Sequence, residues 1–184
     1  MRGLFLFLLA VGMFGILSFP VVADAQFHMG GIDGMMQTVK QQDQSAFTGL
    51  GLRARITSDD LPVHMTLMPT LEYWRNSANL KDFDIEAAEK DLSLGLDGRY
   101  EMTFGAWHPY AGAGFAAHFI NTEFAAPQLG VGPTQADHTK FAPNLLAGLQ
   151  LAPLGPIQSF LETKYAFVSD FKQFKLNWGL GVNF

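Results

Sequence analysis

The sequence has 184 residues, of which 12 are basic and 17 acidic, and its formal net charge is −5. That length suits one domain, and the mild acidic excess argues against a nucleic-acid partner, which requires a basic face. Cysteine is absent, so an exported fold of this chain depends on backbone pairing and packing without disulfides.

The first 25 residues have the pattern of a secretory signal peptide. Arg2 precedes an unbroken apolar run over residues 4–17, and Pro20 ends any helix before the small residues Ala23 and Ala25. An N-terminal membrane anchor is the alternative, but the apolar run is short for a bilayer span of about 20 residues. We therefore expect cleavage after Ala25, which removes one basic and one acidic residue and leaves residues 26–184 as a single domain.

The mature domain has no apolar run long enough for a transmembrane helix, and its apolar residues alternate with polar ones instead. Residues two apart share one face of a β-strand, so this period predicts strands. The alternation is clear in seven segments and weak in a candidate first strand. In chain order the expected strands are residues 27–36, 49–56, 63–73, 91–104, 109–119, 141–151, 161–167 and 174–184.

The connections between these strands alternate in length. Short turn signals lie at residues 58–60, 105–106 and 153–155, whereas longer polar stretches lie at residues 38–44, 77–88 and 123–136. A bacterial outer-membrane barrel has short periplasmic turns, longer outer loops and an even number of strands. We therefore predict an all-β fold, an eight-stranded antiparallel up-and-down transmembrane β-barrel in the cell outer membrane of a Gram-negative bacterium.

The direction of the apolar face separates a membrane barrel from a soluble lipocalin-like barrel, which buries that face. Eight glycines fall on the polar face, where they make room for long side chains in a narrow lumen. They are Gly49, Gly51, Gly95, Gly112, Gly114, Gly148, Gly179 and Gly181. Aromatic residues stand near strand ends on the apolar face, as in the interfacial girdles of membrane barrels. These two features favour an apolar face that points outward into lipid. The aromatic residues are Tyr73, Tyr100, Phe104, Phe119, Tyr165, Phe167 and Phe184.

Charged residues on the polar face then point into the lumen. Buried charges require partners, and we expect Arg53 or Arg55 to pair with Glu72, and Glu72 with Arg99. The network serves either as a packed polar plug or as a narrow charge-lined path for small solutes. Its members are Arg53, Arg55, Glu72, Asp97, Arg99, Glu101, Glu162 and Lys164.

Two stretches resemble a known family. The sequence FLETKYAFVSDFKQFKLNWGLGVNF at residues 160–184, and PYAGAGFAAHF beginning at Pro109, are similar to strands of small porin-like outer-membrane barrels of the opacity and outer-membrane protein A types. The resemblance implies the fold, the location and insertion by the barrel-assembly machinery. It implies an assembly signal formed by Trp178, Leu180, Val182 and Phe184.

Catalytic and metal sites are weakly indicated. His118 and His138 flank the third outer loop, close to Glu123 and Asp137, but no serine lies near that loop and no His-x-x-x-His spacing occurs. We expect no enzyme activity, no metal and no cofactor. The acidic stretch of residues 82–91 is interpreted as a solvated outer loop.

Three functions remain open at this stage. The first is a structural or surface-interaction barrel, the second is a narrow pore, and the third and weakest is a lipid-modifying enzyme. The expected partners are outer-membrane lipid, lipopolysaccharide and a surface ligand at the outer loops.

Overall fold

The computed structural model describes residues 27–42, 44–58, 61–62, 64–80, 85–126, 131–151, 155–169 and 171–184. The expected signal peptide and its cleavage site lie outside the described residues. Within those ranges, no helix is long and apolar enough to cross a membrane.

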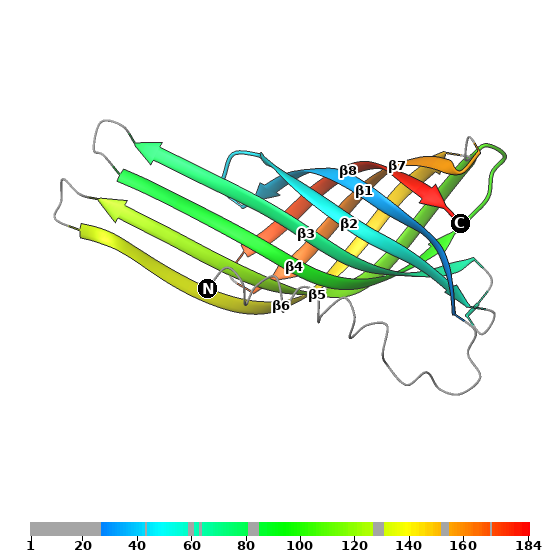
Figure 1. The fold of residues 1–184 in the computed structure, drawn as a ribbon, viewed down its shortest axis with the longest axis horizontal. Coiled ribbons are helices and arrows are strands. Elements are labelled where there is room, and N and C mark those ends of the chain that lie inside the picture. Colours follow the sequence, from blue (N-terminus) through cyan, green and yellow to red (C-terminus); the bar gives the residue numbers. More distant parts are fainter. Residues whose placement is uncertain are drawn as a thin grey trace.

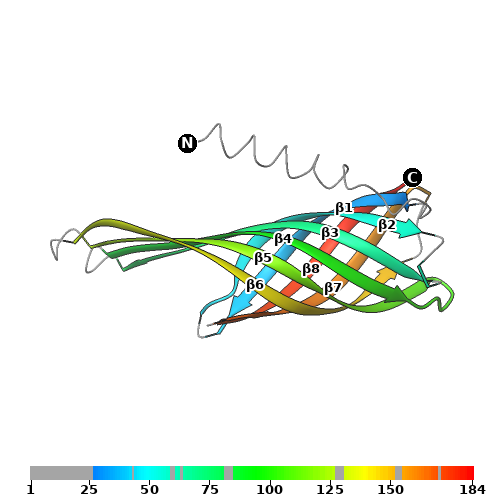
Figure 2. The ribbon, with the colours of Figure 1, turned by 90° about the horizontal axis from the view of Figure 1, so that it is seen from below.

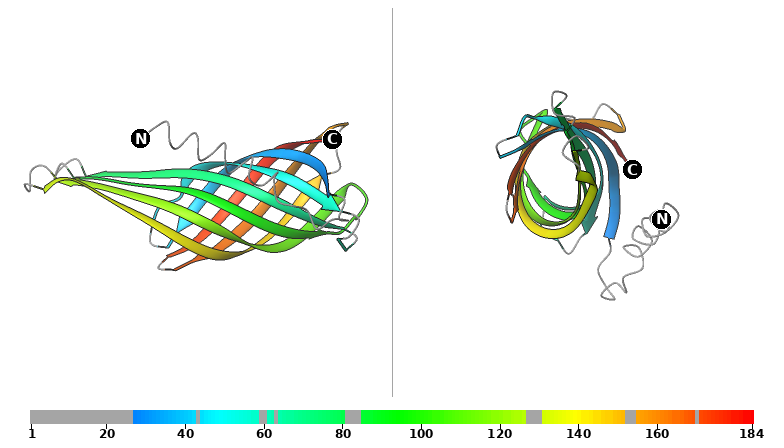
Figure 3. Two further views of the ribbon diagram at one scale, coloured as in Figure 1. Left: turned by 60° about the horizontal axis from the view of Figure 1, so that its bottom comes forward. Right: turned by 90° about the vertical axis from the view of Figure 1, so that its left-hand side faces the viewer.

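Eight antiparallel strands form a closed up-and-down barrel (Figure 1). Each strand pairs with the next one along the chain, and β1 pairs with β8 to close the ring, which is visible end-on in Figure 3. The predicted fold class is confirmed. The strands are β1 Phe27–Gln41, β2 Phe47–Ser58, β3 Met65–Leu80, β4 Ile85–Glu101, β5 Trp107–Ala126, β6 Val131–Leu151, β7 Ile157–Val168 and β8 Phe171–Asn183.

The first strand exists despite its weak sequence pattern. From Gly31 to Gln41 its residues alternate strictly between buried and exposed. The pattern is weak in the sequence because Met35 and Val39 point inward among polar residues, whereas Gly34 points outward among apolar ones. The alternation of polarity fails here, but the alternation of direction holds.

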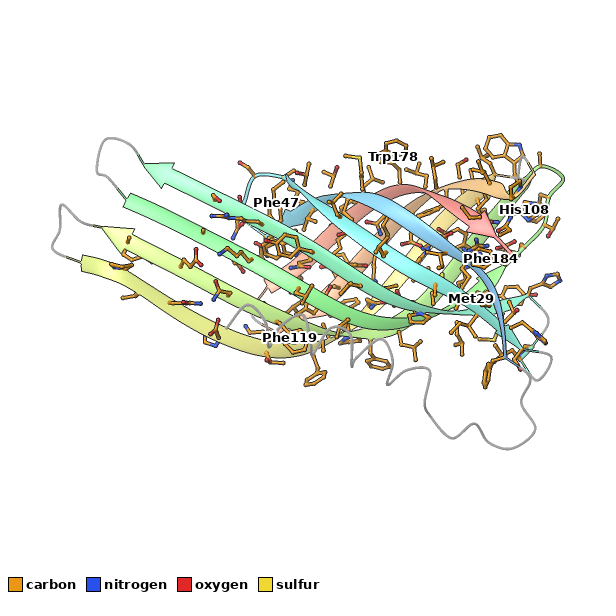
Figure 4. All side chains as sticks on the ribbon, viewed as in Figure 1. Met29, Phe47, His108, Phe119, Trp178 and Phe184 are labelled. Carbon is orange, nitrogen blue, oxygen red and sulfur yellow. The ribbon has the colours of Figure 1, made fainter. Side chains whose placement is uncertain are left out.

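The apolar face points outward, as predicted for a membrane barrel. On β8, Trp178 and Leu180 are 56% and 55% exposed, whereas the inward residues Lys175 and Asn177 are 1% and 0% exposed. Figure 4 shows Trp178 projecting away from the wall. A continuous apolar surface of this kind is stable only against lipid, so the soluble lipocalin-like alternative is excluded by the direction of the side chains.

All three long outer loops expected from the sequence are at least half strand, which corrects that expectation. Residues 38–41 of the first belong to β1. Residues 77–80 and 85–88 belong to the β3–β4 hairpin, and residues 123–126 and 131–136 belong to the β5–β6 hairpin. Their small and polar composition is typical of loops, but cross-strand backbone hydrogen bonding continues through them. We call the projecting four-stranded part, residues 75–80, 85–91, 119–126 and 131–140, the outer sheet; it extends well beyond the rest of the wall (Figures 2 and 3).

The short turns lie at the opposite end of the barrel, together with the C-terminal residue (Figure 1). Gly105 and Gly155 occupy these turns with φ of 62° and 66°, a region that glycine enters without the steric cost of a Cβ atom. By the convention of this class, the short turns face the periplasm and the outer sheet faces the cell exterior.

Candidate functional site

The lumen contains all eight charged residues expected there. Arg53, Arg55, Glu72, Asp97, Arg99, Glu162 and Lys164 are buried, and the side chain of Glu101 is 20% exposed. They come from β2, β3, β4 and β7, at every second position of each strand. The inward half of the alternating pattern therefore brings together charges that are distant in sequence.

One group of contacts is centred on Arg53 of β2. Its Nε atom donates to Asp33 Oδ2 of β1 at 2.7 Å, and its guanidinium also donates to Glu162 Oε2 of β7 at 2.7 Å. The same guanidinium lies 3.9 Å from the centroid of the Phe160 ring. Arg55 Nε donates to the other Asp33 oxygen at 3.0 Å. Arg53 thus links an acid on the adjacent strand to one on a strand that is not its neighbour.

A second group joins opposite walls. Lys164 Nζ of β7 donates to Glu72 Oε1 of β3 at 2.9 Å and to Asp97 Oδ2 of β4 at 2.8 Å. Lys175 Nζ of β8 donates to the second Glu72 oxygen. In the closed ring, β3 and β7 are separated by three strands on either side. The bond between Lys164 and Glu72 therefore crosses the full width of the lumen.

A third group lies nearer the periplasmic end. The Arg99 guanidinium donates to Gln150 Oε1 at 3.0 Å and pairs with Glu101 Oε2 at 3.0 Å. Gln150 donates to Gln158 at 2.9 Å, and Gln158 donates to Asp33 at 3.3 Å. These amides connect the Arg99 group to the Arg53 group through hydrogen bonds.

The expected pairs of Glu72 with Arg53, Arg55 or Arg99 are wrong. The expectation considered only neighbouring strands for Glu72, whereas in this narrow barrel its partners lie across the lumen on β7 and β8. Arg53 and Arg55 do pair with an acid on a neighbouring strand, but that acid is Asp33 of β1. Sequence reasoning also left Asp33 and Lys175 out of the network. The inward direction of Lys175 was predictable from the sequence, since Lys175 follows outward Phe174 in a clearly alternating segment. Asp33 was not predictable in this way, because it lies on the strand with the weakest alternation.

Glycine makes room for these groups, as the sequence suggested. A Cβ atom at Gly114 would collide with Asp97 Oδ1, and one at Gly181 would collide with Asp33 Oδ1. Both glycines stand on the inward face directly beside the acid that uses the space. The packing of the charged side chains in the lumen therefore depends on glycine at these inward positions.

His118 faces a different partner from the one its sequence position suggested. Its Nδ1 atom lies 2.7 Å from Asp91 Oδ2, and both side chains are buried at the outer mouth of the lumen. Asp91 is thus a wall residue and not part of a solvated acidic loop. Asp137 instead accepts from Asn121 at 2.6 Å on the outward face. Within the described residues, no group of three or more side chains is arranged to hold a metal ion.

No family model and no curated protein matches this sequence, but several solved structures share its fold. Neisserial surface protein A matches with a TM-score of 0.63 and 15% identity over 87% of this chain and 99% of its own. Ail, the attachment invasion locus protein of Yersinia pestis, matches with a TM-score of 0.62 and 15% identity over 85% of this chain and 98% of its own. A major outer membrane protein from Thermus thermophilus matches with a TM-score of 0.59 and 13% identity over 85% of this chain and 100% of its own.

The fold and its outward apolar surface define an eight-stranded transmembrane β-barrel of the outer-membrane class. The resemblance to small barrels of this class is confirmed at the level of the fold. The cell outer membrane is the location to which this fold belongs.

Proposed function

We propose that the protein is a non-enzymatic outer-membrane barrel with a structural or surface-interaction role and a lumen plugged by its ionic network. The observation that carries this proposal is the hydrogen bond between Lys164 and Glu72, on opposite walls. An eight-stranded barrel has an interior just wide enough to be filled by side chains. A direct contact across it supports a lumen that is closed to a continuous water column at that level.

The contacts at other levels support the same conclusion. Arg53 reaches both Asp33 and Glu162, and Tyr110 of β5 donates its hydroxyl to the same Glu162 oxygen at 3.0 Å. Breaking a buried pair costs about 3–5 kcal/mol, so opening a path through several linked pairs is strongly disfavoured. The plug is therefore expected to persist at equilibrium.

Planar-bilayer recording of the purified protein tests the plug. We expect no conductance above the bilayer background, because each level of the ionic network must open for ions to pass. Regular single-channel steps from protein free of contaminating porins would overturn the proposed plug and support the pore.

A narrow pore is the second candidate, and one feature of the outer half of the lumen favours it. Among the described residues, the side-chain amides of Gln37, Asn144 and Gln173 are buried without a hydrogen-bond partner. Such groups gain stability when water reaches them, which supports hydration of this part of the lumen. A Lys164→Met variant that conducts where the parent does not would locate the barrier at the Glu72–Lys164 level.

The outer sheet is the part we propose for surface interaction. Its hairpins stand clear of the barrel wall (Figure 2) and expose β6 residues 132–139. Ail has been solved with the heparin analogue sucrose octasulfate, but the outer sheet here carries Glu123 and Asp137 on its outward face. The same face carries Arg75 and Lys90, and Lys90 is paired with Glu123, so its charge is mixed and differs from that of a uniformly basic polyanion-binding surface. Loss of binding to host cells or to neighbouring envelope proteins on shortening both hairpins, with normal barrel assembly, tests the role.

The buried position of the His118–Asp91 pair supports the proposal that the barrel is not an enzyme. The exposed fraction of the His118 side chain is 1% and that of Asp91 is 0%, so a lipid substrate does not reach them. An unchanged lipid A and phospholipid profile in a deletion strain is the expected result, and loss of one modified lipid would contradict it.

The assembly signal also stays a proposal. The outward face of β8 carries an apolar residue at every second position, Trp178, Leu180 and Val182. Phe184 is 74% exposed at the periplasmic end. An outward apolar row beside the β1–β8 seam is accessible during insertion, which supports its recognition by the barrel-assembly machinery.

A further inference from the structure

The lipid-facing wall is hollowed over β1, β2 and β8. Gly34 points outward here, and its cross-strand neighbours are Leu52 on one side and Leu180 on the other. Because Gly34 has no side chain, the larger residues around it border an open hollow of about 630 Å³. The hollow extends across β3 to β4. Its outward lining residues are Gly34, Met36, Leu50, Leu52, Leu71, Tyr73, Leu92, Trp178 and Leu180.

Two cations border the outer end of this hollow. Arg75 stands two residues beyond the lining residue Tyr73, and Lys90 stands two residues beyond Leu92, so both share the outward face. Arg75 and Lys90 are also direct cross-strand partners. Like charges in this position repel each other, and an anion placed between them would remove that penalty.

Only part of the positive charge is neutralised within the protein. Lys90 Nζ pairs with Glu123 Oε1 of β5 at 2.6 Å. Arg75 has no ion pair with any residue in the described part of the chain. The rim is completed by Thr38 and Thr48, which face each other on the outward surface of β1 and β2. The outer border therefore offers cations and hydroxyl groups directly above an apolar surface.

A second hollow provides an internal comparison. It has nearly the same volume, about 640 Å³, and forms around outward Gly98 with Ala113 and Phe115 beside it. The residues two positions beyond its lining on β4, β5 and β6 are Leu94, Ala117 and Phe141, none of which is charged. The two hollows are alike in size and apolar lining and differ in the cations at the outer rim.

We propose that the hollow around Gly34 binds one phosphorylated acyl lipid of the outer leaflet, the lipid A part of lipopolysaccharide. Its acyl chains occupy the hollow beside Trp178 and Leu50, and a phosphate is bound by Arg75 and Lys90. The guanidinium offers paired donors that match phosphate geometry, and the ammonium adds a point charge. The site rests on the proposed outer-membrane barrel and adds a specific lipid and position to it.

Native mass spectrometry of the purified full-length barrel in lipid nanodiscs tests this site. The nanodiscs contain phosphatidylcholine with a small fraction of lipid A, and a parallel set contains dephosphorylated lipid A. We expect retention of lipid A and little retention of the dephosphorylated form. Arg75→Glu with Lys90→Glu is expected to lower lipid A retention by about tenfold or more, since two charge-assisted contacts are lost.

Matched variants separate this site from general attraction to the membrane. Gly34→Phe fills the proposed site, where a Cβ atom meets nothing closer than Leu52 Cδ2 at 3.9 Å, and Gly98→Phe fills the comparison hollow, where the nearest atom is also at 3.9 Å. We expect Gly34→Phe to reduce lipid A retention and Gly98→Phe to leave it unchanged. Lys172→Glu, an exposed charge reversal on β8, is also expected to leave it unchanged.

Several outcomes would overturn the site. Retention that is unaffected by Arg75→Glu with Lys90→Glu, equal loss in both glycine variants, or equal retention of dephosphorylated lipid A each contradicts it. A stable dimer lost on Gly34→Phe would assign the hollow to a second copy of the chain instead. Heat-modifiable gel mobility of every variant reports barrel assembly separately, so failure of the lipid site is distinguishable from failure of the proposed membrane barrel.

Discussion

Glu72 holds two lysines that would otherwise repel each other. Lys164 and Lys175 are direct cross-strand partners on β7 and β8, and each donates to a different oxygen of Glu72. Glu72→Gln keeps the shape of this side chain but removes its charge. Lys164 then keeps Asp97 at 2.8 Å, whereas Lys175 has no other acid paired with it within the described part of the lumen. The variant therefore leaves one buried lysine without a counter-charge.

The expected cost follows from the burial of the pair. The Glu72 and Lys175 side chains are 2% and 1% exposed, so water does not solvate the remaining charge. Removing one partner of a buried ion pair costs about 3–5 kcal/mol, and we expect Glu72→Gln to lower the free energy of unfolding by an amount in that range. Adding Lys175→Met removes the unpaired charge and leaves the Lys164–Asp97 pair. The double variant should recover most of the loss.

Urea unfolding of the barrel in lipid vesicles, followed by tryptophan fluorescence and gel mobility, measures both changes. The four proteins of the cycle give the coupling energy between Glu72 and Lys175 directly. If Glu72→Gln lowers the free energy of unfolding by less than about 1 kcal/mol, as is typical of an exposed ion pair, the reasoning is refuted. A double variant that is less stable than Glu72→Gln alone would also refute it.

Three further changes test the wall and the end of the barrel. Leu180→Arg places a charge on the lipid face and should lower the free energy of unfolding by less than the roughly 2–4 kcal/mol expected at the membrane midplane, because Leu180 lies near the periplasmic end of β8; an unaltered urea midpoint would show that the side chain does not face lipid. Gly114→Leu should reduce the fraction of heat-modifiable barrel, because the new side chain occupies the space of Asp97 Oδ1; full assembly would contradict the packing argument. Phe184→Ala should lower the amount of assembled barrel in the outer membrane without changing export, and unchanged outer-membrane levels would remove Phe184 from the proposed assembly signal.

The strands and their faces were predictable because a β-strand places alternate residues on opposite sides. The seven segments with clear alternation each lie within or largely overlap one strand, and the inward charges follow from the same rule. The outer sheet was not predictable in this way. Residues 77–88 have loop-like composition, and the strand structure of residues 86–88 depends on pairing with residues of the neighbouring hairpin.

The sequence by itself determined the number of strands, the direction of the apolar face and the polar character of the lumen, since these depend on local period and composition. Only the closed tertiary structure decided which charges meet. Lys164 contacts Glu72 although 92 residues separate them, and no pattern along one strand specifies that pairing. The reason is geometric. Closure of the ring places long side chains of opposite walls within hydrogen-bonding distance of each other across the lumen.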